Sequence, residues 1–380
     1  MSAHKSCHIV LTTIHHPAIV QDLYDNIHRH GHLDKVKVWI VGDRKTPGSA
    51  ASLANEISRK GLETSYFDIA QQDEWGKAFS LYGLIPYNTD GRRIFGYLKA
   101  LEEGCDLLLS MDDDNFPTQD DFIGGHQKTG QPWNGRLLKE PARFHNICEY
   151  LETEPQRLIF PRGFPFQLRG HVNRAEFVQA PAGATIGVTE GLWLAEPDID
   201  ATTWLNGKIR AVRYNGPDLV VLEQSTWSPV NTQNTSVVRA LIPAFVFATM
   251  AWPVPGGKLD RYGDIWGGYF LLALMQGTKY HVAFGRPLVE HRRNPHNYVD
   301  DLRYEFWGVI LTDWLLNLLF TSFHPRSADM LERVRELAEF LECEAIKQLP
   351  DWAPQEIHKF MHYTADNLRQ WALACRKVGV

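Results

Sequence analysis

Residues 107–115 have the sequence Leu-Leu-Leu-Ser-Met-Asp-Asp-Asp-Asn, in which an apolar run ends in three successive carboxylates. The run predicts a buried strand, and side chains along a strand point alternately to opposite faces, so Asp112 and Asp114 are expected on one face and Asp113 on the other. Two carboxylates that converge at the end of a strand repel each other unless a cation lies between them. The stretch therefore predicts a hard divalent ion, Mn²⁺ or Mg²⁺, whose remaining ligands are water and a bound diphosphate. The alternative is a solvated acidic turn, since Asp and Asn are common turn residues.

Strand-like and helix-like patterns alternate along the chain up to this stretch. Strands are predicted over residues 9–13, 36–42, 63–68 and 107–111, and helices over 17–30, 48–60 and 91–103. Such alternation favours a right-handed α/β fold with a parallel sheet. Ligands of these sheets bind where the carboxyl ends of the strands meet, and both Asp43 and the Asp triplet are expected there. A nucleotide diphosphate in that crevice would lay its phosphates on the metal ion.

The second half of the chain is less regular. Residues 238–250 are apolar enough for one or two buried strands, and residues 264–277 have the spacing of a helix. Asp264 would lie near the start of that helix, where a negative side chain suits the helix dipole. From residue 300 to the end the pattern is helical, with apolar and charged faces at helical spacing.

Composition, charge and cysteine use favour a cytoplasmic enzyme. The 380 residues are 44% hydrophobic, enough for a large core, and their net charge of −6 offers no basic field for nucleic acid. Five scattered cysteines without a Cys-x-x-Cys pair favour reduced thiols. The start of the chain lacks the continuous apolar region of a signal peptide. The longest apolar stretch, residues 306–320, contains Asp313 and is too short to cross a bilayer, so no membrane span is predicted.

Several further segments carry a resemblance to a known family. The most specific are Arg162-Gly-Phe-Pro-Phe-Gln-Leu-Arg169, Gly191-Leu-Trp-Leu-Ala-Glu-Pro-Asp-Ile-Asp-Ala201 and Arg261-Tyr-Gly-Asp-Ile-Trp-Gly267. The chain also contains further short segments in the same order as the family: Thr13-Ile14, Gly42-Asp43, Arg93-Ile-Phe-Gly-Tyr97, the Asp triplet, His291 and Asn294-Pro295. Together these blocks resemble the reversibly glycosylated polypeptides, which include the plant UDP-arabinopyranose mutases. The resemblance covers about residues 8–310 and fades in segments 44–90 and 118–155 and in the helical tail.

The resemblance implies an α/β fold of the glycosyltransferase A type, with a Rossmann-like, mostly parallel sheet flanked by helices. Residues 1–299 would form the nucleotide-sugar domain, with a nucleotide-binding half (1–115) and a sugar and acceptor half (116–299), and residues 300–380 a helical extension. The implied ligands are a UDP-sugar and a divalent metal. The apolar helical tail and the family's tendency to form complexes favour a homo-oligomer.

Three functions are compatible with this resemblance. The first is a UDP-sugar enzyme that glycosylates itself or acts as a mutase between pyranose and furanose rings. The second is a glycosyltransferase that moves the sugar to a separate small-molecule, protein or glycan acceptor. The third is a non-catalytic partner subunit that keeps the fold without the chemistry, against which the intact candidate residues argue.

The resemblance also implies attachment of the sugar to an arginine of the enzyme, which by position is Arg162, with Arg169 assisting. A guanidinium group is protonated at any physiological pH and is a poor nucleophile. It needs a carboxylate beside it to take or polarise a proton, and Asp264 is the candidate. Alternatively, Arg162 pairs with the leaving diphosphate or is a buried ion-pair arginine.

Each remaining candidate residue has a binding role and a structural alternative. Asp112 and Asp114 would hold the metal, with His291 as a third ligand or a structural histidine. On the nucleotide side, Asp113 would bond the ribose hydroxyls, and Asp43 the uracil or the ribose. The other candidates are Thr13 at the nucleotide, Arg93 at the diphosphate or the Asp cluster, Trp193 and Trp266 as a sugar platform or core residues, and Asp198 and Asp200 at sugar hydroxyls or in the turn after Pro197.

The chain departs from the plant pattern at three places, one of which is a longer 44–90 segment. Plant members have two adjacent acids before Ile/Met-Trp, whereas here Gly263 precedes Asp264. A Glu that follows the second arginine in plants is replaced by Gly170-His171. These changes lie where sugar and acceptor would bind, so they bear on ring interconversion of UDP-arabinose more than on UDP-sugar binding.

Overall fold

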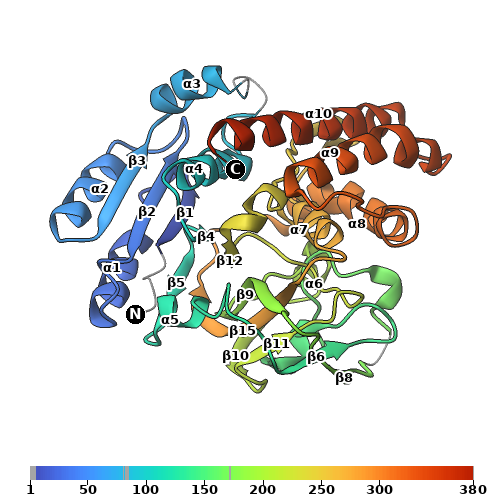
Figure 1. Ribbon diagram of the computed structural model, residues 1–380, viewed down its shortest axis with the longest axis horizontal. Helices are drawn as coiled ribbons and strands as arrows, with labels where there is room; N and C mark the ends of the chain where they lie inside the picture. Colours follow the sequence, from blue (N-terminus) through green and yellow to red (C-terminus); the bar gives the residue numbers. More distant parts are fainter. Residues whose placement is uncertain (1–5, 80, 82–84, 171–172, 380) are drawn as a thin grey trace.

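The computed structural model describes residues 6–79, 81, 85–170 and 173–379. Figure 1 shows a central twisted sheet with helices on both sides and a layer of C-terminal helices beside it. The strand order along the main path of the sheet is β11-β15-β9-β12-β4-β1-β2-β3. The α/β class, with flanking helices and a helical C-terminal segment, is confirmed.

The N-terminal half of the sheet is parallel. Strand β1 pairs in parallel with β2 and β4, and β2 with β3. The elements are β1 (Cys7–Thr13), α1 (Ile19–Arg29), β2 (Val36–Gly42), α2 (Ser49–Arg59), β3 (Glu63–Phe67), α3 (Ile69–Ala78), η1 (Asp90–Arg92), α4 (Arg93–Glu102) and β4 (Leu107–Asp112). The predicted strands and helices of this half are confirmed. Helix α3 was not predicted, although Asp68 and Gln71 form a capping box at its start.

The second half of the sheet is mixed. Strand β12 runs antiparallel to both β4 and β9, and β9 runs parallel to β15. Its strands are β5 (Asn115–Pro117), β7 (Leu151–Glu154), β9 (Thr185–Ala195), β10 (Arg210–Tyr214), β11 (Leu219–Val221), β12 (Asn234–Val238) and β15 (Tyr280–His291). Two separate two-stranded sheets are formed by β6 (Arg136–Lys139) with β8 (Glu176–Gln179) and by β13 (Trp252–Val254) with β14 (Gly257–Leu259). Its helices are α5 (Phe122–His126), α6 (Ala201–Leu205) and α7 (Gly263–Leu274), with short 3₁₀ turns η2 (Ile147–Tyr150), η3 (Phe166–Leu168) and η4 (Arg239–Ala244).

The strands predicted over residues 238–250 are wrong. Strand β12 ends at Val238, the 3₁₀ turn η4 follows, and residues 245–251 have no regular secondary structure. The side chains of Leu241, Ile242 and Phe245 are buried, so the segment is apolar because it lies in the core and not because it forms a strand. Pro243 lies inside η4 and has no N–H to give to a sheet, which is one reason why the segment leaves the strand conformation.

Helix α7 lies at the centre of the molecule. All its side chains are buried, and two adjacent glycines let it approach the neighbouring backbone closely. A Cβ atom at Gly267 would lie 2.1 Å from the carbonyl oxygen of Val246, and one at Gly268 would lie 1.9 Å from that of Val230. This close packing fixes the start of α7, where Asp264 lies in the first turn.

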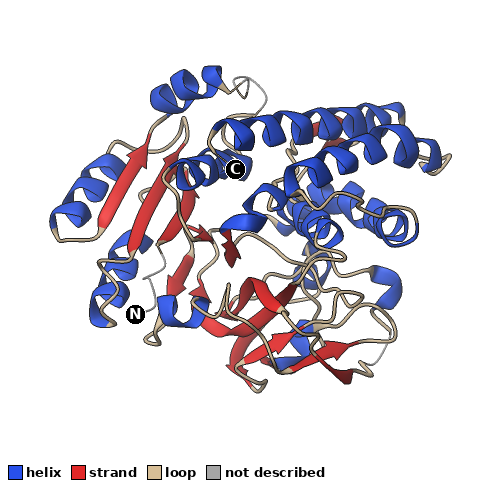
Figure 2. Cartoon of the chain, in the orientation of Figure 1, coloured by secondary structure: helices blue, strands red, loops and turns tan. Residues whose placement is uncertain are grey.

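The C-terminal segment forms helices α8 (Tyr298–Thr321), α9 (Met330–Phe340) and α10 (Gln355–Lys377), with two short turns, η5 (Leu341–Ala345) and η6 (Ile346–Gln348), after α9. Helices α8 and α9 pack on α7, and α10 reaches α4 (Figures 1 and 2). Buried residues of these helices, such as Leu315 and Trp371, belong to the same hydrophobic cluster as Ile9 of β1. Among the described helices, none combines the length and apolar character that crossing a membrane requires.

Candidate active site

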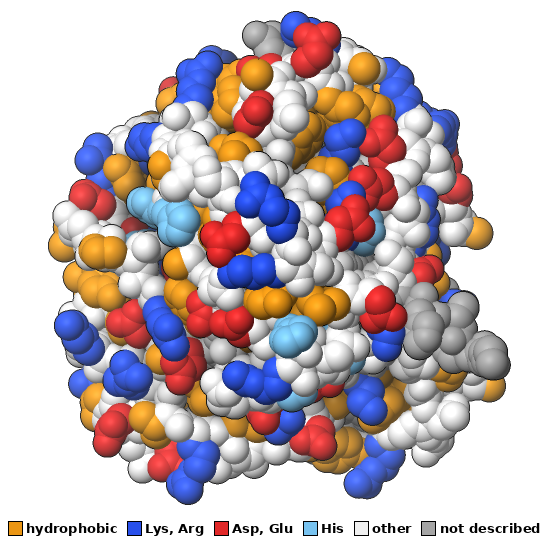
Figure 3. All heavy atoms as spheres, turned by 90° about the vertical axis from the view of Figure 1, so that its left-hand side faces the viewer, with side chains coloured by type: hydrophobic (Ala, Val, Ile, Leu, Met, Phe, Trp, Pro, Cys, Tyr) orange, Lys and Arg blue, Asp and Glu red, His pale blue; other side chains and the backbone are white. Residues whose placement is uncertain are grey.

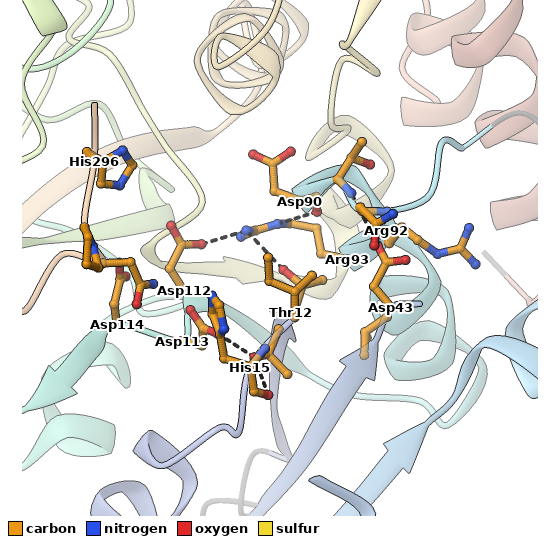
Figure 4. Close-up of a pocket in the computed structure, with 17 residues that line it drawn as sticks. Thr12, His15, Asp43, Asp90, Arg92, Arg93, Asp112, Asp113, Asp114 and His296 are labelled. Atoms are coloured by element: carbon orange, nitrogen blue, oxygen red, sulfur yellow. Dashed lines mark hydrogen bonds and ion pairs between the residues drawn. The ribbon is translucent and has the colours of Figure 1, made fainter. Parts of the chain in front are cut away.

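Two adjoining cavities lie at the carboxyl ends of β1, β2 and β4. The outer cavity has a volume of about 310 Å³ and the inner cavity one of about 120 Å³. Figure 4 shows the outer cavity, in which residues from the three strand ends face one another. The two cavities share the lining residues Asp90, Arg93, Asp112, Asp114 and His296.

The outer cavity contains the residues expected on the nucleotide side. Thr13 donates a hydrogen bond of 2.5 Å from its hydroxyl to Asp113, which joins the end of β1 to the turn after β4. Asp43 accepts hydrogen bonds from the backbone N–H groups of Asn88 at 2.6 Å and Thr89 at 3.3 Å, and so fixes the loop before η1. Burial raises the pKa of Asp113 to about 6. The predicted contacts of these residues with uracil and ribose stay predictions.

Arg93 contacts the Asp cluster, one of the two roles expected for it. Its Nη2 lies 2.6 Å from Oδ1 of Asp112, and its Nη1 donates to Ser110 at 3.1 Å and to the hydroxyl of Thr232 at 2.8 Å. The side chain is buried, and Figure 4 shows it reaching across the floor of the cavity toward Asp112. Arg93 thus orients one carboxylate of the triplet.

Asp112, Asp114 and His291 all line the inner cavity, as expected for metal ligands. Nε2 of His291 lies 3.4 Å from Oδ2 of Asp114, and Nδ1 of His291 is buried with no hydrogen-bond partner among the described residues. Carboxylate and imidazole groups are suitable ligands for Mn²⁺. Within the described residues, no three His, Cys, Asp or Glu side chains stand close enough together to enclose a metal ion by themselves. The donor set fits a cation that completes its shell with water and phosphate oxygens.

Arg162 lies between two carboxylates in the inner cavity. Its Nε and Nη2 donate to Asp198 at 3.0 and 3.1 Å, and its Nη1 and Nη2 donate to Asp264 at 3.1 and 2.7 Å. Nη1 also donates to the backbone carbonyl of Arg261. A guanidinium has five N–H groups, and all of them are therefore engaged. Although burial opposes the charge, the two carboxylates raise the pKa of Arg162 well above its ordinary value.

Arg261 lies in the loop that precedes α7. Its φ angle of 64° lies in the left-handed region, which is costly for a residue with a side chain. Its Nε lies 3.0 Å from Oε1 of Glu305 and its Nη1 lies 3.4 Å from Oδ1 of Asp301, both on α8. Glu305 also accepts a hydrogen bond of 2.8 Å from the N–H of Ala201. We call this arrangement the Glu305 bridge, because one carboxylate of α8 holds both the Arg261 loop and the segment that follows Asp198.

Arg169 and Asp200 form a pair beside the site but line neither cavity. Nη2 of Arg169 lies 2.7 Å from Oδ2 of Asp200, and its guanidinium stacks on Phe166 at 3.6 Å. Asp200 caps α6 by accepting from the N–H of Thr203 at 3.0 Å. Of its two expected roles, Asp200 therefore has the one in the turn after Pro197. The assisting role of Arg169 stays a prediction, and His171, which follows it in the chain, lies outside the described residues.

Of the two roles considered for Trp193 and Trp266, sugar platform and core residue, the structure shows the core position. Both side chains have 0% exposure, and the indole of Trp266 donates to the hydroxyl of Thr312 at 3.0 Å. Trp266 also packs against Phe360 of α10. A strand in the middle of the sheet and a helix buried on all sides leave no face for a ligand, so both residues are core residues.

Several residues that line the inner cavity were not predicted from the sequence. They are Asp90, Thr232, Gln233, Arg261, Arg293 and His296. Asp90 is the most informative, because it lines both cavities. Desolvation by the cavity walls raises the pKa of its carboxyl to about 6; repulsion from Asp264, Asp260 and Asp112 adds to this shift, and attraction by Arg93 opposes it. In the sequence it stands in Asn-Thr-Asp-Gly, which is typical of a turn and carries no signal of a site.

The comparisons with known proteins identify the family. The family model of the reversibly glycosylated polypeptides matches residues 67–378, so the chain belongs to this family. The match includes the helical tail, where the resemblance was expected to fade. UDP-arabinopyranose mutase 1 of Oryza sativa subsp. japonica is 26% identical over 253 residues, which are 66% of this chain and 63% of the relative. UDP-arabinopyranose mutase 2 of Arabidopsis thaliana is 28% identical over 229 residues, 59% of this chain and 57% of the relative. The chain thus matches less than two thirds of the length of these relatives.

Solved structures show a weaker likeness. Glucosyl-3-phosphoglycerate synthase from Mycobacterium tuberculosis, in complex with Mg²⁺ and uridine diphosphate, has a TM-score of 0.41 and 14% identity, with 85% of this chain and 82% of that chain covered. A mannosyltransferase from Pyrobaculum calidifontis, in complex with GDP-Man and Mn²⁺, has a TM-score of 0.38 and 13% identity, with 99% and 74% covered.

Proposed function

We propose that the protein is a metal-dependent enzyme of the glycosyltransferase A type that uses a UDP-sugar, either as a mutase of the sugar ring or as a glycosyltransferase. The observation that carries the proposal is the pair of adjoining cavities, which share Asp112 and Asp114 and place the Arg162–Asp264 pair in the inner one. Membership of a family whose relatives are named UDP-arabinopyranose mutases supports a UDP-sugar as the ligand. The retained carboxylates and arginine argue against a non-catalytic partner subunit.

The two cavities suggest a division of labour. The uridine would lie in the outer cavity beside Thr13, Asp43 and Asp113, and the sugar in the inner cavity beside Arg162 and Asp264. Mn²⁺ or Mg²⁺ held by Asp112, Asp114 and His291 would neutralise the charge of the diphosphate as it leaves the sugar. Arg93 would keep Asp112 turned toward the shared wall.

The contacts of Arg162 bear on the choice between the candidate reactions. Attack by this arginine on the sugar would require an N–H group to leave a carboxylate and the guanidinium to lose a proton. All five N–H groups are engaged, and the pKa of Arg162 is raised well above its ordinary value by Asp198 and Asp264. This arrangement favours a role in which Arg162 holds the two carboxylates. It supports ring interconversion or transfer to a separate acceptor over glycosylation of Arg162.

The reaction is tested with the full-length protein, Mn²⁺ and a panel of labelled UDP-sugars that includes UDP-arabinopyranose and UDP-glucose. Chromatography measures changes of the sugar ring and release of UDP, and gel electrophoresis measures label on the protein. We expect product from at least one sugar with the wild type and none with Asp112→Ala, which removes a metal ligand. Asp22→Ala, an exposed acid on α1, is the control.

Two outcomes would revise the proposal. Stable label on the wild-type protein that disappears in Arg162→Lys would show that the arginine accepts the sugar. Absence of ring conversion, UDP release and label with every sugar would overturn the proposed function.

A further inference from the structure

We propose that Asp90 binds the hydroxyl groups of the sugar and so helps to select which UDP-sugar is used. The inference rests on the proposed function, because it assigns a residue to the sugar end of the same ligand. It starts from position: Asp90 lines both the outer and the inner cavity. Its carboxylate therefore stands at the passage between the place of the nucleotide and the place of the sugar.

Asp90 differs from the other carboxylates of the inner cavity in having no partner. Asp112 is bonded to Arg93, Asp114 lies next to His291, and Asp198 and Asp264 are both bonded to Arg162. Among the described residues, the Asp90 carboxylate makes no hydrogen bond or ion pair. The Arg93 guanidinium attracts the Asp90 carboxylate but does not bond to it. The carboxylate oxygens are therefore free acceptors, and sugar hydroxyl groups are donors that such acceptors can bind.

The backbone around Asp90 is held in place although its side chain is free. The carbonyl oxygen of Asp90 accepts from Nε of Arg93 at 3.1 Å. On the other side, Asp43 holds the N–H groups of Asn88 and Thr89. A free acceptor on a fixed backbone loses little conformational freedom when a ligand binds, which is the property of a preorganised contact.

The charges around Asp90 indicate which part of the ligand it meets. Asp264, Asp260 and Asp112 repel a negative charge at this position, whereas Arg93 attracts one. Arg93 is already paired with Asp112, so a phosphate group beside Asp90 would meet more negative charge than this one guanidinium offsets. The uracil is expected near Asp43, which stands, with Arg92, at the right-hand end of the labelled residues in Figure 4. A neutral sugar with several hydroxyl donors is the part of a UDP-sugar that fits the position.

The test compares the affinities of UDP and of UDP-sugars for the full-length protein. Isothermal titration calorimetry with Mn²⁺ gives Kd for UDP, UDP-arabinopyranose, UDP-galactose and UDP-glucose with the wild type, Asp90→Ala and Asp90→Asn. We expect UDP to bind all three proteins within about twofold, since Asp90 does not touch the nucleotide. The UDP-sugar that the wild type binds best should bind Asp90→Ala about 10- to 100-fold more weakly, the loss of a charged hydrogen bond. Asp90→Asn, which keeps an acceptor oxygen, should lose less.

The remaining outcomes decide against the inference in distinguishable ways. An equal loss for UDP and UDP-sugar in Asp90→Ala would place the residue at the nucleotide, and no loss for either would show that it binds nothing. Both results leave the proposed function intact. A wild-type protein that binds neither UDP nor any of the UDP-sugars would remove the proposed function and the inference together. Asp22→Ala, with affinities equal to wild type, controls for a general effect of losing an acid.

Discussion

Arg162 shows how much of the site depends on one side chain. Its guanidinium lies between Asp198 and Asp264 and forms an ion pair with each of them, although both carboxylates are buried. Such a cluster contributes little net stability when intact, because desolvation offsets the attraction of the charges. Removing the central cation leaves two buried negative charges without compensation, so the loss should greatly exceed the worth of an exposed ion pair.

The first prediction compares Arg162→Gln with Arg292→Gln. Arg292 pairs with Glu290 at 3.0 Å, and both side chains are about half exposed. We expect Arg162→Gln to lower the free energy of unfolding by about 3–5 kcal/mol and Arg292→Gln by less than about 1 kcal/mol. Urea denaturation measures both values. Similar losses in the two variants would mean that Arg162 is not the centre of a buried charge cluster.

The second prediction concerns a buried histidine outside the site. His126 is bonded through Nε2 to Asn234 at 2.8 Å and through Nδ1 to Ser236 at 3.0 Å, and burial lowers its pKa from 6.5 to about 4. Between these two values the unfolded chain binds a proton that the folded protein does not, so stability falls as the pH falls through this window.

The measurement for His126 is the free energy of unfolding at pH 7.5 and pH 4.5 for the wild type and His126→Gln. The wild type should lose about 2–3 kcal/mol more than the variant over this range. A gap between the two proteins that is the same at both pH values would contradict a depressed histidine pKa.

At the scale of elements, α7 is placed by backbone contacts rather than by side chains alone. The third prediction is that Gly268→Ala lowers the free energy of unfolding by at least about 2 kcal/mol, although alanine favours a helix by nearly 1 kcal/mol, because the new methyl group meets the carbonyl of Val230. Gly48→Ala is the control, since Gly48 has a φ of −60° and no atom lies within 4 Å of its Cβ position. Differential scanning calorimetry should show a Tm below that of the wild type for Gly268→Ala but not for Gly48→Ala. Equal Tm values for the two variants would mean that α7 can shift freely.

The elements also show what the sequence could and could not predict. Local patterns were sufficient for β1 to β4, α7 and the C-terminal helices. β1, β2 and β4 are short apolar runs, α7 is apolar along its whole length, and α9 and α10 have an apolar face at helical spacing. Residues 238–250 failed because an apolar run has the same composition in a buried irregular segment as in a strand. Whether such a run forms a strand depends on the elements packed around it, and the sequence of the segment alone does not contain that information.

The site was predictable where its residues are neighbours in the chain. All three residues of the Asp triplet line the outer cavity, and Asp112 and Asp114, but not Asp113, also line the inner one, in agreement with their alternation along the chain. Asp90 was not predicted because its segment is typical of a turn, and Glu305 because it is joined to the site only by contacts with Arg261 and Ala201. For Trp193 and Trp266 the sequence left two roles open, because a tryptophan has equal apolar surface whether a ligand or a helix covers it.

At the scale of the whole molecule, the C-terminal helices belong to the site as well as to the core. On the face at the left of Figure 1, over α1 and α2, positive and negative side chains are interspersed (Figure 3). Inside the molecule, charged side chains instead form ion pairs and hydrogen bonds between segments that are distant in the sequence. The Glu305 bridge is the main example, since it connects α8 with the Arg261 loop and with Ala201.

The fourth prediction tests this bridge with Glu305→Gln. We expect kcat of the proposed reaction to fall at least about tenfold while Kd for UDP stays within about twofold, because the Arg261 loop adjoins the inner cavity and not the outer one. Glu344→Gln, which breaks an exposed pair with Lys347, is the control and should change neither value. Equal changes in kcat and UDP affinity would point to a general loss of folding instead.

The left-handed backbone of Arg261 has a practical consequence. A residue in this conformation relaxes once its restraints are removed, and both ion pairs of the Arg261 side chain are made with α8. A shortened protein that ends before Tyr298 would free the peptide whose carbonyl receives Arg162. Trimming the tail to obtain a smaller catalyst should therefore remove the geometry on which turnover depends, together with the part of the hydrophobic core that α8 to α10 supply.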